Sequence, residues 1–115
     1  MKIRIATRTS PLALLQTNQV ISLIESAEPS SVCEIIPIES EGDLTEAPLH
    51  LIGGKGLFVS KLEAALSNGD ADIAVHSLKD VPALLDPKFS IAATLSREDP
   101  SDAILLKDGI TFNDL

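Results

Sequence analysis

Segments with strand-like patterning alternate with segments of helical spacing along this chain. Lys2–Thr7 alternates charged and apolar residues, which predicts a half-buried strand. Apolar residues then recur at helical spacing from about Pro11 to Ala27, and Pro29 ends that helix. A second strand is predicted over 32–38, and a second helix runs from near Leu57 to a cap at 68–69. Such alternation favours an α/β domain with a largely parallel sheet.

The second half of the sequence contains three further apolar segments of strand length. They cover 72–76, 89–95 and 102–106, with a turn or a single helical turn over 77–82. Residues 111–115 resemble the first turn of a helix, so we expect the chain to be a piece of a longer one.

Composition excludes several classes of function. The 115 residues have the size of one domain, and 9 Lys+Arg against 17 Asp+Glu give a net charge of −8. No nucleic-acid partner is expected, because such binding needs a basic surface. Apolar runs are too short to span a bilayer, and the charged N-terminus is unlike a signal peptide. The single cysteine, Cys33, excludes an internal disulfide and favours the reducing cytoplasm; we expect it to be a small buried hydrophobe.

The stretch Ala6-Thr7-Arg8-Thr9-Ser10-Pro11 joins a predicted strand end to a predicted helix start. Ser10 is a good N-cap, and Pro11 suits the first helical turn. Ligands of α/β sheets bind at the carboxyl ends of strands, and helix N-termini attract anions. Arg8 adds a bidentate donor for a carboxylate. The alternative is a surface arginine beside an ordinary cap, and the spacing does not choose between the two.

Gly53-Gly54-Lys55-Gly56 precedes the second predicted helix. It is not a phosphate-binding P-loop, because glycine stands where Ser or Thr must follow the lysine. It also lacks the dinucleotide-binding pattern of glycines. Two interpretations remain: Lys55 and the loop N–H groups hold an anion, or the stretch is a flexible hairpin.

The segment 76–82, His-Ser-Leu-Lys-Asp-Val-Pro, follows a predicted buried strand. Ser77 is a poor candidate nucleophile because no Gly-x-Ser-x-Gly elbow surrounds it. No metal site is expected, because the histidines and the cysteine lack ligand spacing. Either Lys79 binds an anion while Asp80 faces a cation or an N–H group, or the segment is a charged surface turn with a partly buried His76.

Taken in order, these segments resemble the porphobilinogen deaminase (hydroxymethylbilane synthase) family. The resemblance rests on R-I-A-T-R-T-S-P-L-A-L at 4–14, E-G-D at 41–43, G-G-K-G-L-F at 53–58, A-D-I-A-V-H-S-L-K-D-V-P at 71–82 and R-E-D-P-S-D-A at 97–103. It implies a transferase of haem and tetrapyrrole biosynthesis. Such an enzyme joins four porphobilinogen units into linear hydroxymethylbilane and releases ammonia at each step.

The resemblance also implies a fold and a domain organisation. The family's first domain is similar to type II periplasmic binding proteins, with a central mixed, mostly parallel sheet flanked by helices. Residues 1–98 would form this domain, incomplete at its C-terminal end, and 99–115 would be the hinge and the start of a truncated second domain. In the family, chain that returns after the second domain completes the first domain's sheet. That return is missing here, so the resemblance implies a vacant sheet position, which residues 102–106 would fill in the same chain or in a self-associated copy. A dipyrromethane cofactor is attached to a cysteine of a third domain, which Cys33 does not match. The chain alone is therefore expected to be inactive, and the full-length enzyme to be a monomer.

Site residues follow from the matched motifs. The resemblance implies that Asp80 is the catalytic carboxylate, which stabilises the azafulvene cation formed when ammonia leaves. Carboxylates of the substrate, of the growing pyrrole chain and of the cofactor would be held by Arg8, Ser10, Lys55, Ser77 and Lys79. Ser60 stands where the family often has a lysine. The alternative from another class is a stand-alone α/β module that binds small carboxylates without catalysis.

Overall fold

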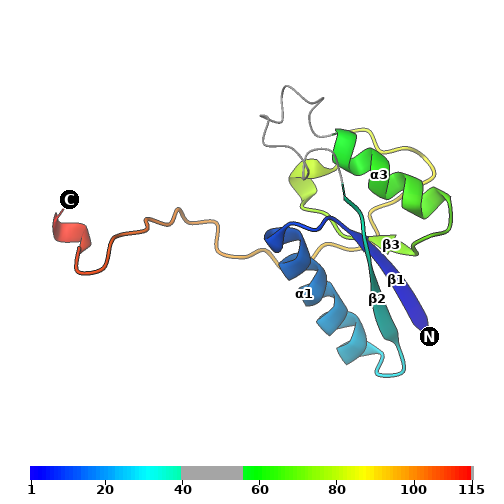
Figure 1. Cartoon of the computed structure of the whole chain (residues 1–115), viewed down its shortest axis with the longest axis horizontal. Coiled ribbons are helices and arrows are strands. Elements are labelled where there is room, and N and C mark those ends of the chain that lie inside the picture. The colour runs from blue at the N-terminus through cyan, green and yellow to red at the C-terminus, as the bar shows by residue number, and fades with distance from the viewer. Residues whose placement is uncertain (40–55, 115) are drawn as a thin grey trace.

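The computed structural model describes residues 1–39 and 56–114, with the side chains of 56–60 and 112 excepted. Its elements are β1 (Lys2–Thr7), α1 (Pro11–Ala27), β2 (Val32–Pro37), α3 (Gly56–Ser67) and β3 (Ile73–Ala74), followed by 3₁₀ turns at Leu78–Asp80 and Phe112–Asp114. Strands and helices alternate and pack into one unit, called the body below, from which the C-terminal part of the chain extends (Figure 1). The predicted α/β class is confirmed.

The three described strands form a sheet in the order β2-β1-β3, and both pairings are parallel. β1 pairs with β2 along its whole length and with β3 at Ile5 and Ala6, which lie opposite Ile73 and Ala74. The mixed sheet that the family resemblance implied is not seen among these strands. Because all three strands run the same way, the carboxyl ends of β1 and β3 lie at one edge of the sheet.

Helix α1 begins where the cap residues predict. The Oγ of Ser10 accepts a hydrogen bond from the N–H of Ala13 at 3.3 Å, and Pro11 occupies the first helical turn. The helix then docks on β1 through polar side chains: the hydroxyl oxygens of Thr17 and Thr7 are 2.8 Å apart, and both residues are fully buried. A hydrogen-bonded pair of this kind offsets the cost of burying two hydroxyls.

The apolar core is small and lies between β1 and α3. Ala6 and Leu62 are fully buried, and Ala65 and Ala71 are nearly so. α3 ends at the predicted cap, where Gly69 has a φ of 77°. Glycine is favoured there because this left-handed conformation strains residues that carry a Cβ atom.

An ion pair joins β1 to the segment before β3. The Arg4 guanidinium contacts the Asp72 carboxylate through two nitrogens, with the closest N–O distance at 2.7 Å, and also donates to the carbonyl of Gly69. The backbone N–H of Arg4 donates to the same carboxylate at 2.8 Å. These hydrogen bonds from Arg4 lower the pKa of Asp72 to about 2.

β3 is shorter than the predicted strand over 72–76. Only Ile73–Ala74 pairs as a strand, although the N–H groups of Asp72 and Val75 still donate to the carbonyls of Arg4 and Ala6. β2 likewise ends at Pro37, one residue before the predicted end. The 3₁₀ turn Leu78–Asp80 confirms the single helical turn predicted after β3.

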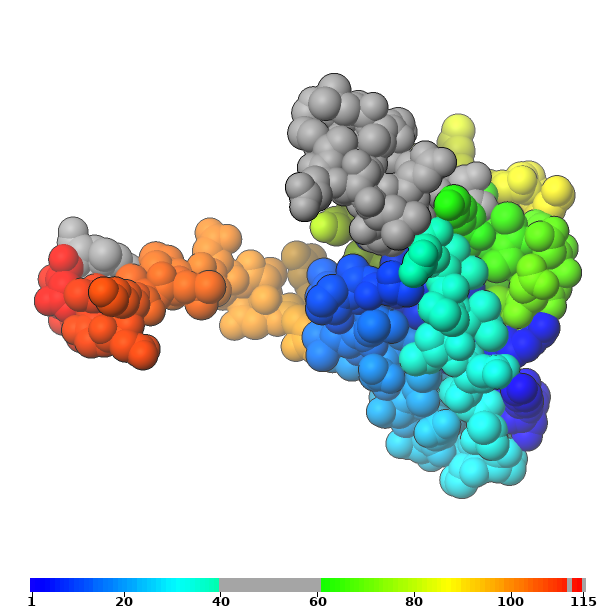
Figure 2. Space-filling model, in the orientation of Figure 1, coloured from blue at the N-terminus to red at the C-terminus, as the bar shows by residue number. Residues whose placement is uncertain are grey.

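Two further strand predictions are wrong. Residues 89–95 and 102–106 have no regular structure, and Ile104 and Leu105 are 62% and 96% exposed. Figure 2 shows the C-terminal stretch, residues 99–114, leading away from the strands and helices, so 102–106 does not fold back into its own sheet. An apolar segment forms a strand only where a neighbouring strand completes its hydrogen bonds. Pairing with a second copy stays a prediction.

The predicted helical turn near the end is present as the 3₁₀ turn Phe112–Asp114. The Asp114 carboxylate caps it by accepting hydrogen bonds from the N–H and the hydroxyl of Thr111. Among the described residues, no helix combines the length and apolar character needed to cross a membrane.

Candidate functional site

A small pocket of about 110 Å³ lies where β1 and β3 end. Its lining includes five of the six candidate residues: Arg8, Ser10, Ser77, Lys79 and Asp80. The sequence brings the first two there because they follow β1 directly, and the last three because they follow β3. The sixth candidate, Lys55, lies outside the described residues, as does Gly53-Gly54. The remaining lining residues are Leu12, Ala13, Gln16, Val75 and His76.

At the β1 side of this pocket, the hydroxyl of Ser10 can both accept and donate a hydrogen bond. Its Oγ accepts a hydrogen bond from the N–H of Ala13, so that one N–H group of the helix start is not available to an anion. Since the oxygen acts as an acceptor toward the helix, the hydroxyl proton of Ser10 is left to be donated elsewhere.

Buried hydroxyls hold the backbone next to Arg8. Thr7 Oγ1 donates to the carbonyl of Arg8 at 3.1 Å, and Thr17 Oγ1 is 2.8 Å from both Thr7 Oγ1 and the carbonyl of Ala13. Arg8 itself is half-buried. The sequence analysis missed Thr17, because a threonine within a helix is ordinarily read as a neutral surface position.

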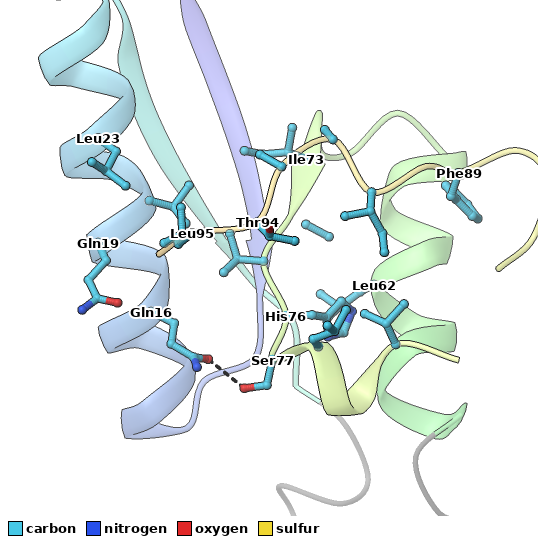
Figure 3. A pocket seen from close by; sticks show the side chains of 18 of the residues that line it. Gln16, Gln19, Leu23, Leu62, Ile73, His76, Ser77, Phe89, Thr94 and Leu95 are labelled. Atoms are coloured by element: carbon cyan, nitrogen blue, oxygen red, sulfur yellow. Dashed lines mark hydrogen bonds between the residues drawn. The ribbon is translucent and has the colours of Figure 1, made fainter. Parts of the chain in front are cut away.

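On the β3 side, the hydroxyl of Ser77 is committed to α1. Ser77 Oγ donates to Oε1 of Gln16 at 3.0 Å, as the dashed line in Figure 3 shows. The carbonyl of Ser77 also accepts from the N–H of Asp80 at 2.9 Å, which closes the turn that carries Lys79 and Asp80. Gln16 was missed as a site residue; its only signal was an amide within an otherwise apolar helical stripe.

His76 is half-buried beside the charged residues of the pocket. Burial is the main cause that lowers its pKa, Arg8 lowers it further, and Asp80 acts in the opposite direction. The imidazole is therefore neutral at neutral pH. Lys79 is exposed and Asp80 is half-buried. The Asp80 carboxylate and the Arg8 guanidinium thus both lie within electrostatic range of the neutral imidazole.

Two further kinds of chemistry would use His, Cys, Asp or Glu side chains: metal binding and thiol reactivity. No group of three or more His, Cys, Asp or Glu side chains in it could hold a metal ion. Cys33 lies on β2 and is half-buried rather than buried as predicted. Burial, with a smaller contribution from Glu25, raises the pKa of its thiol. A raised pKa keeps the sulfur protonated and weakly nucleophilic.

A larger groove of about 1540 Å³ lies between α1 and α3 beside β3. Figure 3 shows Leu23 on α1, Leu62 on α3 and Ile73 on β3 around it, with Thr94 and Leu95 crossing between the helices. The segment predicted as the strand 89–95 therefore lines this groove without pairing to β3. Gln16, His76 and Ser77 line both the groove and the small pocket.

These features define an α/β domain with a polar pocket at the carboxyl ends of its parallel strands. The family model described as "Porphobilinogen deaminase, dipyromethane cofactor binding domain" matches residues 3–115. The chain belongs to the porphobilinogen deaminase family.

Relatives with about 50% sequence identity agree with this assignment. Over 104 residues, 90% of this chain, it is 49% identical to the porphobilinogen deaminase of Stenotrophomonas maltophilia (strain K279a). Over the same length it is 51% identical to that of Rickettsia prowazekii (strain Madrid E) and 52% identical to that of Rickettsia rickettsii (strain Sheila Smith). The matches cover 34%, 35% and 30% of those proteins, so the chain spans about a third of the length of its curated relatives.

Proposed function

We propose that this chain supplies one wall of the active site of a porphobilinogen deaminase. That enzyme joins four porphobilinogen units into hydroxymethylbilane and releases ammonia at each step. The observation that carries the proposal is the pocket in which Arg8, Ser10, Ser77, Lys79 and Asp80 meet, since these residues come from two matched motifs about 70 positions apart. The assignment to the family supports it independently.

A domain organisation for the whole protein follows from the same proposed function. Residues 1–98 form the first domain, of the type II periplasmic-binding-protein kind, and 99–115 are the hinge and the start of a second domain. The parallel order β2-β1-β3 and the departure of the chain after about residue 97 support this division. We propose a cytoplasmic, monomeric enzyme without nucleic-acid or membrane partners, in keeping with the net charge of −8.

Asp80 is proposed as the catalytic carboxylate. Positive charge develops on the pyrrole of porphobilinogen as ammonia leaves, and a half-buried carboxylate facing that ring stabilises it. The same carboxylate can accept and return the pyrrole N–H proton. Its neighbour His76 is neutral, so it does not neutralise the carboxylate.

The donor set of the pocket fits a dipyrromethane cofactor. Each of its two pyrroles carries an acetate and a propionate, and Arg8, Lys79 and the donating hydroxyl of Ser10 are suitable partners for such carboxylates. Lys55 is proposed to join them. The bound cofactor supplies the pyrrole end to which the first substrate unit is joined. Cys33 does not fit as its attachment point, because its thiol has a raised pKa and lies on β2 away from the pocket lining.

The test is a chimeric enzyme. The 104 matched residues of the Stenotrophomonas relative are replaced by those of this chain, and hydroxymethylbilane formation from porphobilinogen is measured. We expect the chimera to be active and the isolated 115-residue chain to be inactive. Asp80→Asn in the chimera keeps the shape but removes the charge, which should lower kcat by roughly a hundredfold with an unchanged melting temperature.

Two outcomes would contradict the proposal. One is a folded but inactive chimera beside an active parent enzyme, with the isolated chain still binding acetate or porphobilinogen; that result favours the stand-alone carboxylate-binding module. The other is near-normal turnover by the Asp80→Asn chimera, which would remove Asp80 from the catalytic role.

A further inference from the structure

Gln16 has a position that the proposed function leaves unused. It is half-buried on α1 and lines both the small pocket and the groove. Its neighbours in the pocket include Arg8 and Ser10, whose side chains are suited to carboxylates. A polar side chain at such a junction either closes the pocket or contacts what enters it.

The bond to Ser77 determines which end of the Gln16 amide is available. Ser77 donates its hydroxyl proton to Oε1 of Gln16, with an O–O distance of 3.0 Å. A carboxamide is planar and carries its acceptor and its donors at opposite ends. With Oε1 taken, the Nε2 end is left with two N–H donors, and among the described residues no acceptor is bonded to them.

The two serines of the pocket have opposite hydrogen-bond polarity. Ser10 accepts from the N–H of Ala13, so its own proton is left for a ligand. Ser77 gives its proton to Gln16 instead. A carboxylate has only acceptor atoms, so Ser10 can bind one directly, whereas Ser77 in this arrangement cannot. On the β3 side of the pocket, the group that can donate a hydrogen bond to a carboxylate is therefore the Gln16 amide and not the Ser77 hydroxyl.

We propose that Gln16 is a carboxylate-binding residue of the pocket and that Ser77 is the positioning residue that orients its amide. The ligand class is a pyrrole acetate or propionate, so the inference rests on the proposed function. Nε2 of Gln16 donates to one carboxylate oxygen in the pocket that Arg8 and Ser10 also line. The uncharged amide donor of Gln16 adds a hydrogen bond to the bidentate, charged contact that Arg8 can make with the same carboxylate.

The experiment compares two charge-matched variants of the active chimera. Gln16→Glu keeps an acceptor for Ser77 but replaces the N–H donors by a negative charge that repels a carboxylate. Gln19→Glu introduces the same charge one helical turn away, at an exposed residue that lines the groove but not the small pocket. We expect Gln16→Glu to raise KM for porphobilinogen roughly 10- to 100-fold with kcat changed by less than about threefold. Gln19→Glu should change both less than about twofold.

A double-mutant cycle tests the role of Ser77. Gln16→Met removes the amide at similar length, and Ser77→Ala removes the hydroxyl that orients it. If Ser77 acts through Gln16, Ser77→Ala should raise KM severalfold in the starting chimera and have little further effect beside Gln16→Met. Melting temperatures of all variants show whether a variant has merely lost its fold.

Several results would overturn the inference while leaving the proposed function intact. An active chimera in which Gln16→Glu behaves like Gln19→Glu excludes carboxylate binding by Gln16. Additive effects of Ser77→Ala and Gln16→Met exclude the positioning role. An inactive parent chimera, by contrast, contradicts the proposed function itself. If Gln16→Glu fails to fold, the KM of Gln16→Met tests carboxylate binding by Gln16 instead. An unchanged KM for Gln16→Met would exclude that binding.

Discussion

β1 and the stretch 102–106 are both short segments with strand-like sequences, yet they have opposite surroundings. Ile5 and Ala6 in β1 are fully buried, whereas Ile104 and Leu105 are 62% and 96% exposed. β1 has a parallel neighbour on each side, and both α1 and α3 pack against it, while no described strand lies beside 102–106. A strand-like sequence of this length therefore becomes a strand through its partners, because each partner satisfies backbone groups that water would otherwise bind.

The same contrast applies to the hydrogen bonds. Several of those in the body join residues far apart in sequence, such as Arg4 to Asp72 and Ser77 to Gln16. Beyond residue 83, the hydrogen bonds of the described residues are local, such as those from Ser101 to Asp99 and from Thr111 to Asp114. We therefore expect the body to unfold cooperatively and the C-terminal stretch to contribute little to its stability. Three changes to the isolated 115-residue chain test this difference.

The largest effect is expected from Leu62→Ala. Leu62 is fully buried between α3 and β1, so its truncation should lower the free energy of unfolding by about 3 kcal/mol. The matched control is Leu105→Ala, at a residue that is 96% exposed, where we expect a change within about 0.5 kcal/mol. Urea unfolding followed by circular dichroism measures both. Equal losses for the two variants would mean that Leu105 is buried in solution, as in a self-associated copy.

Thr17→Val should have an intermediate effect. It keeps the shape of the side chain but removes the hydroxyl bonded to Thr7 in a fully buried contact. We expect a loss of about 1–2 kcal/mol, because Thr7 Oγ1 then loses a buried partner. Thr94→Val provides the control at an exposed threonine that lies outside this buried contact. If Thr17→Val is neutral or stabilising, the hydroxyl pair does not hold α1 to β1.

The smallest effect is expected from Asp72→Asn, and it depends on pH. The pKa of Asp72 is lowered to about 2 by Arg4, so the ion pair contributes stability above the ordinary pKa of 3.8. That contribution is lost as the pH falls from 3.8 through about 2. Since the pair is partly exposed, we expect only a modestly lower urea midpoint for the variant at pH 6.

Below pH 2 the difference between Asp72→Asn and the unmodified chain should vanish. Asp99→Asn is the control, because the pKa of Asp99 is also lowered, but by Ser101 two residues away in the C-terminal stretch. Its urea midpoint should follow that of the unmodified chain at every pH. A pH-independent loss for Asp72→Asn would show that the Arg4 contact is not electrostatic.

The features determined by sequence alone are those that depend on a few neighbouring residues. Ser10-Pro11 predicted the start of α1, and Asn68-Gly69 predicted the end of α3 with its positive φ. The alternation of elements predicted the α/β class, and matched motifs at the two strand ends identified the candidate residues. Caps, turns and periodicity can be predicted in this way because their energetics act within one or two turns of chain.

Only the tertiary structure decided which apolar stretches are strands and which polar groups pair. The sequence of 102–106 resembles a strand as well as β3 does, but only β3 lies beside β1. Likewise, Gln16 and Ser77 are 61 residues apart, and nothing local to either one shows that the hydroxyl of Ser77 reaches the amide of Gln16. Such pairings depend on how α1 and β3 pack against β1, so their physical basis is long-range and appears only when the chain has folded.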